Sequence, residues 1–183
     1  VGTVLVKDIF SGPDSSNPSL FTLVNGVTTF AADDGIAGRE LWRSDGTTLG
    51  TVLVKDILPG SAGSNPTVLK KVGENVLFAA NDGVRGNEVW LSNGAEQGTR
   101  VMSEIEPGIA GSDPTEIFEF GAKVLVAATN TMVGNEVWIA DVPAGSPLPL
   151  ELLEFKGTIV NRDGLLQWKT ENENNTNEFI IER

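Results

Sequence analysis

The sequence predicts an all-β fold in which about three repeats form four-stranded blades of a β-propeller, followed by the first strands of a β-sandwich. Three observations support this prediction. A 48-residue unit recurs without gaps over residues 3–50, 51–98 and 99–146. Each unit holds short runs rich in β-branched and apolar residues, and these runs are separated by Asn-Gly, Asp-Gly and Gly-X turns. A fixed period of about 40–50 residues with four strands per unit is typical of propeller blades.

The second repeat gives the clearest series of strands. Its β-prone runs cover residues 67–72, 75–80, 88–92 and 99–105. Gly73-Glu74 and Asn81-Asp82-Gly83 are predicted to be turns, because these residue types tolerate positive φ angles. In the first repeat, Asn25-Gly26 predicts a type I′ hairpin turn between the first two strands. The longest connection, residues 59–66, is expected to lead to the next blade across one face of the disc.

The two ends of the array are expected to be incomplete. Residues 4–9 read as a fourth strand with no three strands before it, and residues 116–140 supply three strands before the pattern breaks at 141–147. The N-terminal strand could close the last blade of a ring, but three blades are fewer than the usual four to eight. We therefore expect the chain to be a fragment, with further blades upstream. The third copy is degenerate, as terminal repeats are, so the array is expected to end there.

The tail predicts the beginning of a second domain. Residues 147–150 form a proline linker, and residues 151–183 are assigned to an incomplete sandwich of the fibronectin III or immunoglobulin kind. The expected order is a strand at 152–160, a hairpin turn at 162–164, a tryptophan-bearing strand at 165–170, a polar loop and a strand at 178–183.

Composition excludes several classes of function. The chain has neither cysteine nor histidine, which removes disulfides, thiolate metal sites, Ser-His-Asp catalysis and the common zinc sites. Its formal net charge of −12 argues against nucleic acid as a partner. No apolar run approaches the roughly 20 residues needed to span a bilayer, so membrane insertion is not expected.

Two stretches carry a resemblance to a known family. Glu40-Leu-Trp-Arg-Ser-Asp-Gly-Thr47 and Gly50-Thr-Val-Leu-Val-Lys-Asp-Ile57 resemble the ELWxxDGT repeat family, over about 144 residues in three copies. The tail, with Leu166-Gln-Trp-Lys-Thr170, resembles the fibronectin-like module near the C-terminus of many Bacteroidota surface proteins. The resemblance implies a secreted or cell-surface location and export by type IX secretion. It supplies no enzymatic activity that could be transferred to particular residues.

The residues repeated in every copy are a glutamate and a tryptophan two positions later. A ring of carboxylates could bind a ligand or metal, but a structural role is favoured, in which each glutamate accepts hydrogen bonds from a neighbouring blade or turn. The tryptophans could form a sugar-stacking platform, although filling the space between blades is the favoured interpretation. These repeat-structural residues are Glu40, Trp42, Glu88, Trp90, Glu136 and Trp138.

Calcium is a further candidate at the Asp-Gly turns. Asp33, Asp34 and Asp82 could offer oxygen ligands, but only part of a ligand set is visible and the loop loses its acids in the third copy. A plain turn is the default interpretation, and no cofactor is otherwise expected. Paired carboxylates for glycoside hydrolysis were also considered, but no acid stands out by its placement, so the chain is expected not to be an enzyme.

Three functions remain open. The favoured one is a non-catalytic scaffold within a larger secreted or surface-anchored adhesin, whose partners are other blades or domains of the same protein and a surface glycan or protein. The second is a structural subunit of an extracellular filament. The third is an accessory binding module of a secreted glycan-degrading enzyme whose catalytic domain lies elsewhere.

Overall fold

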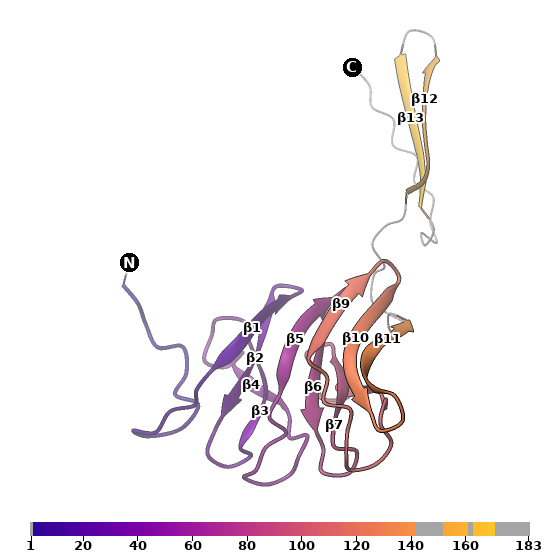
Figure 1. Cartoon of the computed structure of the whole chain (residues 1–183). Helices are drawn as coiled ribbons and strands as arrows, with labels where there is room; N and C mark the ends of the chain where they lie inside the picture. The colour runs from indigo at the N-terminus through magenta and orange to yellow at the C-terminus, as the bar shows by residue number, and fades with distance from the viewer. Residues whose placement is uncertain (1, 142–151, 161–162, 171–183) are drawn as a thin grey trace. The chain divides into compact units, whose positions relative to one another are not determined.

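The computed structural model describes residues 2–141, 152–160 and 163–170 (Figure 1). The chain divides into two compact units, Val1–Ser146 and Pro147–Arg183. Within the described residues the regular structure consists of antiparallel strands with no helix, which confirms the predicted all-β class. It follows that no described segment forms a helix long and apolar enough to cross a membrane.

The first unit contains three antiparallel sheets, and in each sheet the strands are neighbours in sequence order. The first sheet comprises β1 (Ser19–Val24), β2 (Val27–Asp33), β3 (Arg39–Ser44) and β4 (Val52–Lys55). The second comprises β5 (Thr67–Val72), β6 (Asn75–Asn81), β7 (Asn87–Ser92) and β8 (Arg100–Ser103). The third has only β9 (Glu116–Phe120), β10 (Lys123–Asn130) and β11 (Gly134–Asp141). The fourth strands, β4 and β8, come from the first residues of the following 48-residue repeat.

The predicted turns lie where the sequence places them. Asn25 and Gly26 both have positive φ angles, 52° and 78°, and they join β1 to β2 as a type I′ turn requires. Gly73, with a φ of 57°, begins the two-residue turn between β5 and β6. Because side chains alternate along a strand, these tight turns fix which residues of each strand face the neighbouring sheet.

The core lies between successive sheets. One buried cluster joins Val24 and Leu41 of the first sheet to Phe78 and Trp90 of the second. A second cluster repeats the arrangement between the second and third sheets. The three sheets therefore follow one another face to face, as the colour sequence from indigo to orange in Figure 1 shows. Each repeat depends on its neighbours for burial, which is how a repeat array gains stability.

The structure differs from the sequence prediction at the N-terminal strand, and it supports the all-β class without a closed propeller ring. Residues 4–9 were expected to form a strand, but they form none. The physical reason is that a strand exists through its ladder, and none of the described strands pairs with this segment. The three sheets also do not close into a ring, so the repeats are stacked four- and three-stranded sheets.

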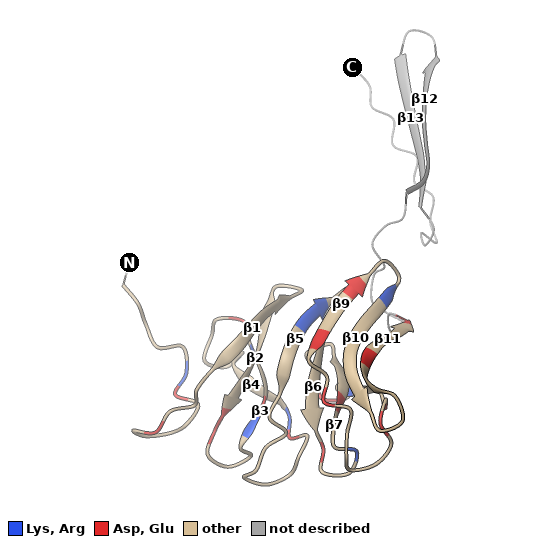
Figure 2. Ribbon diagram, in the orientation of Figure 1, with Lys and Arg blue, Asp and Glu red and all other residues tan. Residues whose placement is uncertain are grey.

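The second unit contains an antiparallel pair, β12 (Leu152–Val160) and β13 (Asp163–Thr170). This agrees with the first two strands expected in the tail. The proline linker at 147–150 and the expected strand at 178–183 lie outside the described residues. Figure 2 shows acidic and basic residues interspersed along strands and loops of the first unit.

Candidate functional site

The first repeated glutamate is buried and holds the connection that follows its own sheet. Glu40 lies on β3 with no exposed surface. Its carboxylate accepts hydrogen bonds from the backbone N–H of Leu58 (3.1 Å), the backbone N–H of Ser64 (2.7 Å) and the hydroxyl of Ser64. Burial raises the pKa of Glu40, although the Ser64 hydroxyl and the amides of Leu58 and Ser64 favour its ionised form.

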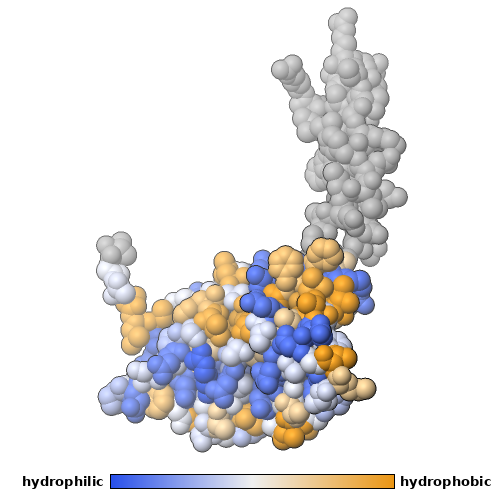
Figure 3. All heavy atoms as spheres, in the orientation of Figure 1, coloured by the Kyte–Doolittle hydropathy of each residue, from blue (hydrophilic) through white to orange (hydrophobic). Residues whose placement is uncertain are grey.

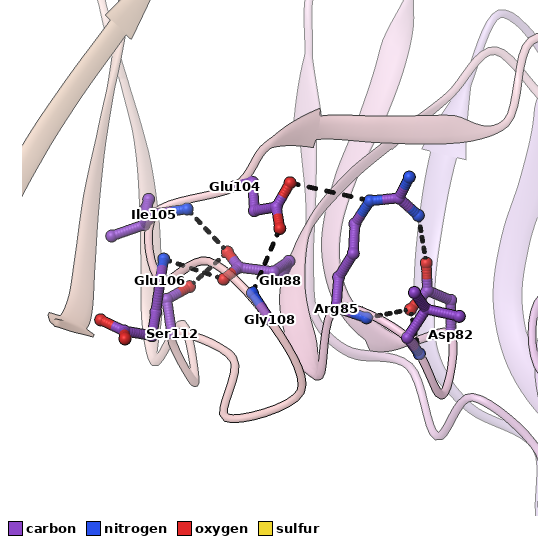
Figure 4. Close-up of polar contacts among 9 residues, drawn as sticks. Asp82, Arg85, Glu88, Glu104, Ile105, Glu106, Gly108 and Ser112 are labelled. Carbon is purple, nitrogen blue, oxygen red and sulfur yellow. Dashed lines mark hydrogen bonds and ion pairs between the residues drawn. The ribbon is translucent and has the colours of Figure 1, made fainter. Parts of the chain in front are cut away.

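The second repeated glutamate is engaged in a similar way one repeat later. Glu88 on β7 is also fully buried. It accepts hydrogen bonds from the backbone N–H groups of Ile105 (3.1 Å) and Glu106 (3.0 Å) and from the hydroxyl of Ser112 (2.6 Å), as Figure 4 shows. Each carboxylate thus ties the third strand of a sheet to the segment that leads into the next sheet. We call this arrangement the glutamate clamp.

The third repeated glutamate is not buried. Glu136 lies on β11, on the exposed side of the third sheet. The segments held by Glu40 and Glu88 follow the fourth strand of a sheet, and the third sheet has no fourth strand among the described residues. Glu136 therefore has the position of a clamp residue without the segment that a clamp would hold.

Two of the three repeated tryptophans pack between sheets, and the third packs between the first sheet and the N-terminal segment. Trp90 belongs to the cluster that joins the first two sheets, and Trp138 packs at the edge of the cluster that joins the second and third. Trp42 is buried with Phe30 and is covered by Ile9 of the N-terminal segment. The indole N–H of Trp138 donates to a backbone carbonyl at 3.0 Å, whereas the N–H groups of Trp42 and Trp90 are buried with no hydrogen-bond partner in the described structure. Trp42 and Trp90 are buried and cannot serve as a stacking platform for sugars, while Trp138 is partly buried.

The aspartates considered for calcium bind backbone amides of their own turns. Asp33 accepts from Gly35 N, and Asp34 accepts from Ile36 N and Ala37 N, each at 2.7–2.8 Å. In the next repeat Asp82 accepts from the equivalent amides and also binds the guanidinium of Arg85 at 2.6 Å (Figure 4). Among the described residues no three acidic side chains gather as a metal site. The oxygens are engaged in turn formation.

The Asp-Gly-Thr part of the motif also builds a turn. The Asp45 carboxylate accepts from both the N–H and the hydroxyl of Thr47, at 2.9 and 2.7 Å. These two bonds hold the pKa of Asp45 below its usual value. The Ser44 and Thr51 hydroxyls lie 2.6 Å apart and link the ends of β3 and β4. The equivalent hydroxyls of the second repeat lie 2.7 Å apart.

One recurrent contact, from a lysine ammonium group to a threonine carbonyl, was not predicted from the sequence. The ammonium group of Lys7 donates to the backbone carbonyl of Thr51 at 2.7 Å, and that of Lys55 donates to the carbonyl of Thr99 at 3.1 Å. Lys7 also lies 5.9 Å from the centre of the Trp42 ring. The signal was present in the spacing, since Lys7 and Lys55 are 48 residues apart and precede an aspartate in both copies. The third copy has Ser103 at this position.

A polar pocket of about 320 Å³ lies between the ends of the first two sheets. It is lined by Asn25, Glu74, Asn75, Leu91, Asn93, Gly98 and Arg100. Its volume falls at the small end of the range for ligand pockets, about 300–1,000 Å³. Most of its lining comes from positions that change between copies, which distinguishes it from the repeated Glu and Trp positions.

The fold and these contacts define an all-β repeat protein in which Glu40, Glu88, Trp42 and Trp90 are buried within the architecture, whereas Glu136 is exposed. No family model, no curated protein and no solved structure matches the chain.

Proposed function

We propose that the chain is a non-catalytic repeat scaffold of a larger secreted or cell-surface protein, and that it presents a surface to a glycan or protein ligand. The observation that carries this proposal is the use of the motif residues. Glu40 and Glu88 are fully buried and engaged with backbone amides and a serine hydroxyl. Their carboxylates hold the architecture and are not displayed toward a substrate. The location, and export by type IX secretion, rest on the resemblance to ELWxxDGT repeats.

The polar pocket between the first two sheets is the place where we expect a ligand to bind. Arg100 and Glu74 offer opposite charges there, and asparagine amides offer both donors and acceptors. Hydroxyl-rich glycans are recognised by such paired donors and acceptors, whereas the described pocket lining contains no tryptophan for stacking.

A binding experiment tests the proposal. Purified protein is applied to a glycan array and to intact cells, and the variants Arg100→Ala and Lys71→Ala are compared with it. Lys71 is exposed on β5 and does not line the pocket, so it is the matched control. We expect Arg100→Ala to weaken binding by about tenfold to a hundredfold and Lys71→Ala to leave it unchanged, since one charge-assisted hydrogen bond is worth about 1.5–3 kcal/mol. Absence of binding, with the parent protein located inside the cell, would contradict the proposal.

A further inference from the structure

One loop in each of the three sheets carries an exposed apolar residue at its tip. Ile36, Val84 and Met132 lie 48 residues apart, in the loops that follow β2, β6 and β10. They are 79%, 68% and 90% exposed, so none of them contributes to the core. The third repeat keeps an apolar residue here although it has lost the Asp-Gly turn. Single exposed apolar residues are ordinary, but a set at one position of a repeat points to an interaction surface.

The turn itself fixes each apolar tip. In every repeat, the backbone N–H of the tip residue donates to the side-chain oxygen of the residue two positions earlier, which makes an Asx turn. The pairs are Asp34–Ile36 at 2.8 Å, Asp82–Val84 at 2.9 Å and Asn130–Met132 at 2.9 Å. The third copy changes the aspartate to asparagine and still makes this bond. Because the backbone is held before a partner arrives, binding loses less conformational entropy.

The loops of the second and third sheets adjoin the connection that runs between them. A Cβ added at Gly86, in the loop of Val84, would lie 2.5 Å from the carbonyl oxygen of Ile109 in that connection. At its other side the connection meets the third loop, since Glu106 accepts hydrogen bonds from the amide and hydroxyl of Thr131. Ile109 is itself 74% exposed. Apolar residues of adjoining segments thus follow one another across this end of the unit.

The loops of the first and second sheets are joined in the same way. A Cβ added at Gly38 would lie 2.6 Å from the carbonyl oxygen of Ser61, and one at Gly83 would lie 2.8 Å from the side chain of Leu58 in the same connection. Figure 3 shows apolar atoms among polar ones at this end of the unit, which lies at the bottom of the view. We call this surface the loop face; it comprises residues 33–39, 56–65, 81–87, 104–115 and 130–134.

The loop face is acidic. It contains seven acidic residues and two arginines, and both arginines are engaged. Arg85 binds Asp82 at 2.6 Å and lies 3.8 Å from Glu104 (Figure 4). Arg39 donates to the backbone carbonyl of Asn17 at 2.8 Å. The exposed acids of the face are Asp56, Glu104 and Asp113. A surface of this sign repels nucleic acid and anionic lipid and attracts cationic groups.

We propose that the loop face binds a protein segment in which apolar side chains alternate with lysine or arginine. The apolar side chains of the partner cover the tips and Ile109, and its cations pair with the exposed acids. Such charge complementarity speeds association and makes it dependent on salt. This surface is separate from the polar pocket. The pocket is lined by Asn75, at the start of β6, whereas the loop face begins at Asn81, where β6 ends.

Peptide binding tests the chemistry of the partner. A fluorescently labelled peptide of alternating leucine and lysine is titrated with the whole chain, and its anisotropy is measured. In one matched peptide glutamate replaces lysine, and in another serine replaces leucine. We expect only the leucine–lysine peptide to bind, and its affinity to fall as salt is added. Equal binding of the serine–lysine peptide would reduce the effect to the net charge of −12 and would overturn the proposal, as would a leucine–lysine peptide that stays unbound.

Serine variants locate the binding on the loop face. Val84→Ser should weaken binding of the leucine–lysine peptide about tenfold, and the triple variant Ile36→Ser/Val84→Ser/Met132→Ser about a hundredfold or more, because apolar area buried in the complex is lost. Leu49→Ser is the matched control, since Leu49 is also exposed but lies between β3 and β4, at the other end of β3. It should leave the affinity unchanged, and so should Arg100→Ala in the polar pocket.

The substituted side chains are all exposed, so each variant should fold, which circular dichroism verifies. An unchanged affinity in the triple variant, or an equal loss in Leu49→Ser, would refute the assignment to the loop face. Other occupants give other results. Self-association above the chain mass of 19.4 kDa that is lost in the triple variant would mean that a second copy covers the face. Co-sedimentation with phosphatidylcholine vesicles that is lost in the same variant would mean a lipid surface. Either result would overturn the proposal.

Discussion

The glutamate clamp makes a quantitative prediction about stability. Replacing Glu88 by alanine removes the acceptor of three donors, which are the buried amide of Glu106, the buried hydroxyl of Ser112 and the part-buried amide of Ile105. A buried donor left without a partner costs about 1–3 kcal/mol. Three such donors would set a cost of about 3 kcal/mol at the lower end, and more if water cannot enter the site. We expect Glu88→Ala to lower the free energy of unfolding by about 3–5 kcal/mol.

This loss is large compared with the whole stability of a domain, typically about 5–15 kcal/mol. The equivalent change Glu40→Ala should give a similar loss, because Glu40 also accepts three hydrogen bonds, from the amides of Leu58 and Ser64 and from the Ser64 hydroxyl. Ser112→Ala removes one donor together with its single contact and should cost only about 1 kcal/mol. The loss of unfolding free energy in Glu88→Ala, divided by the loss in Ser112→Ala, therefore indicates how many donors depend on one carboxylate.

The assay is urea denaturation followed by far-ultraviolet circular dichroism, at one fixed chain concentration for all variants. Glu116→Ala is the control, since this exposed side chain on β9 should change stability by no more than about 0.5 kcal/mol. The reasoning would be refuted if Glu88→Ala cost less than about 1 kcal/mol with an unchanged denaturant slope. Such a result would mean that solvent replaces the carboxylate without penalty, and that the clamp does not hold the sheets together.

Three further perturbations test the packing and the turns. Trp90→Ala should cost about 3–5 kcal/mol in the same urea assay, because the ring is buried between the first two sheets. Burial opposes ionisation of Asp82, but the amides of Arg85 and Val84 and the Arg85 guanidinium hold its pKa below the usual value. The ionised Asp82 therefore stabilises the fold above pH 3.8, and this contribution is lost as pH falls through the lower pKa of the folded state. Asp82→Asn should therefore cost no more than about 1 kcal/mol at pH 7, because solvent screens the pair with Arg85, whose side chain is 43% exposed, and it should cost less near pH 2. Asp34→Asn, which has no arginine partner among the described residues, should cost less at pH 7. Gly86→Ala should destabilise more than Gly134→Ala in thermal unfolding, because both have positive φ but only at Gly86 would a Cβ lie 2.5 Å from backbone atoms.

The strands and turns of the second repeat could be predicted because local chemistry dictates them. Residues 67–72 and 75–80 alternate or run apolar between turn residues, and the structure places β5 and β6 there. The fourth strands are shorter than expected, since β8 covers only residues 100–103 of the expected 99–105. The chain after β8, including Ile105 and Glu106, turns aside so that both amides donate to Glu88. The contact with Glu88 therefore ends the strand early. The pattern of apolar residues along the sequence does not indicate such long-range contacts.

The repeated residues were easier to identify than their partners. Identity between copies marks Glu40 and Glu88 as structural, but their donors are mostly backbone amides, which any residue type supplies. Leu58 and Glu106 occupy the same position in two copies and share no side-chain chemistry. Only Ser64 and Ser112 carry a side-chain signal, as serines repeated at the 48-residue spacing. Comparison of the repeats therefore identifies the glutamates and serines of the clamp, but not its backbone donors.

The third repeat illustrates how a divergent copy can keep a contact by changing both of its sides. In the first two copies a bulky apolar side chain packs on a turn glycine. A Cβ at the glycine would lie 2.5 Å from Phe10 in the first copy and 2.8 Å from Leu58 in the second. Neither glycine could therefore gain a side chain while its apolar partner stayed in place.

In the third copy both partners differ. Glu106 replaces the apolar residue, and Thr131 replaces the glycine. The Glu106 carboxylate accepts hydrogen bonds from the Thr131 amide at 2.8 Å and hydroxyl at 3.0 Å. Asn130 supports the same turn by donating to the Ile105 carbonyl at 3.0 Å. An apolar contact has thus been exchanged for a polar one at the same place in the fold. Since either change alone would create a clash or leave a buried carboxylate without donors, the loss of the Asp-Gly turn is a paired substitution that preserves the packing of the third sheet on the second.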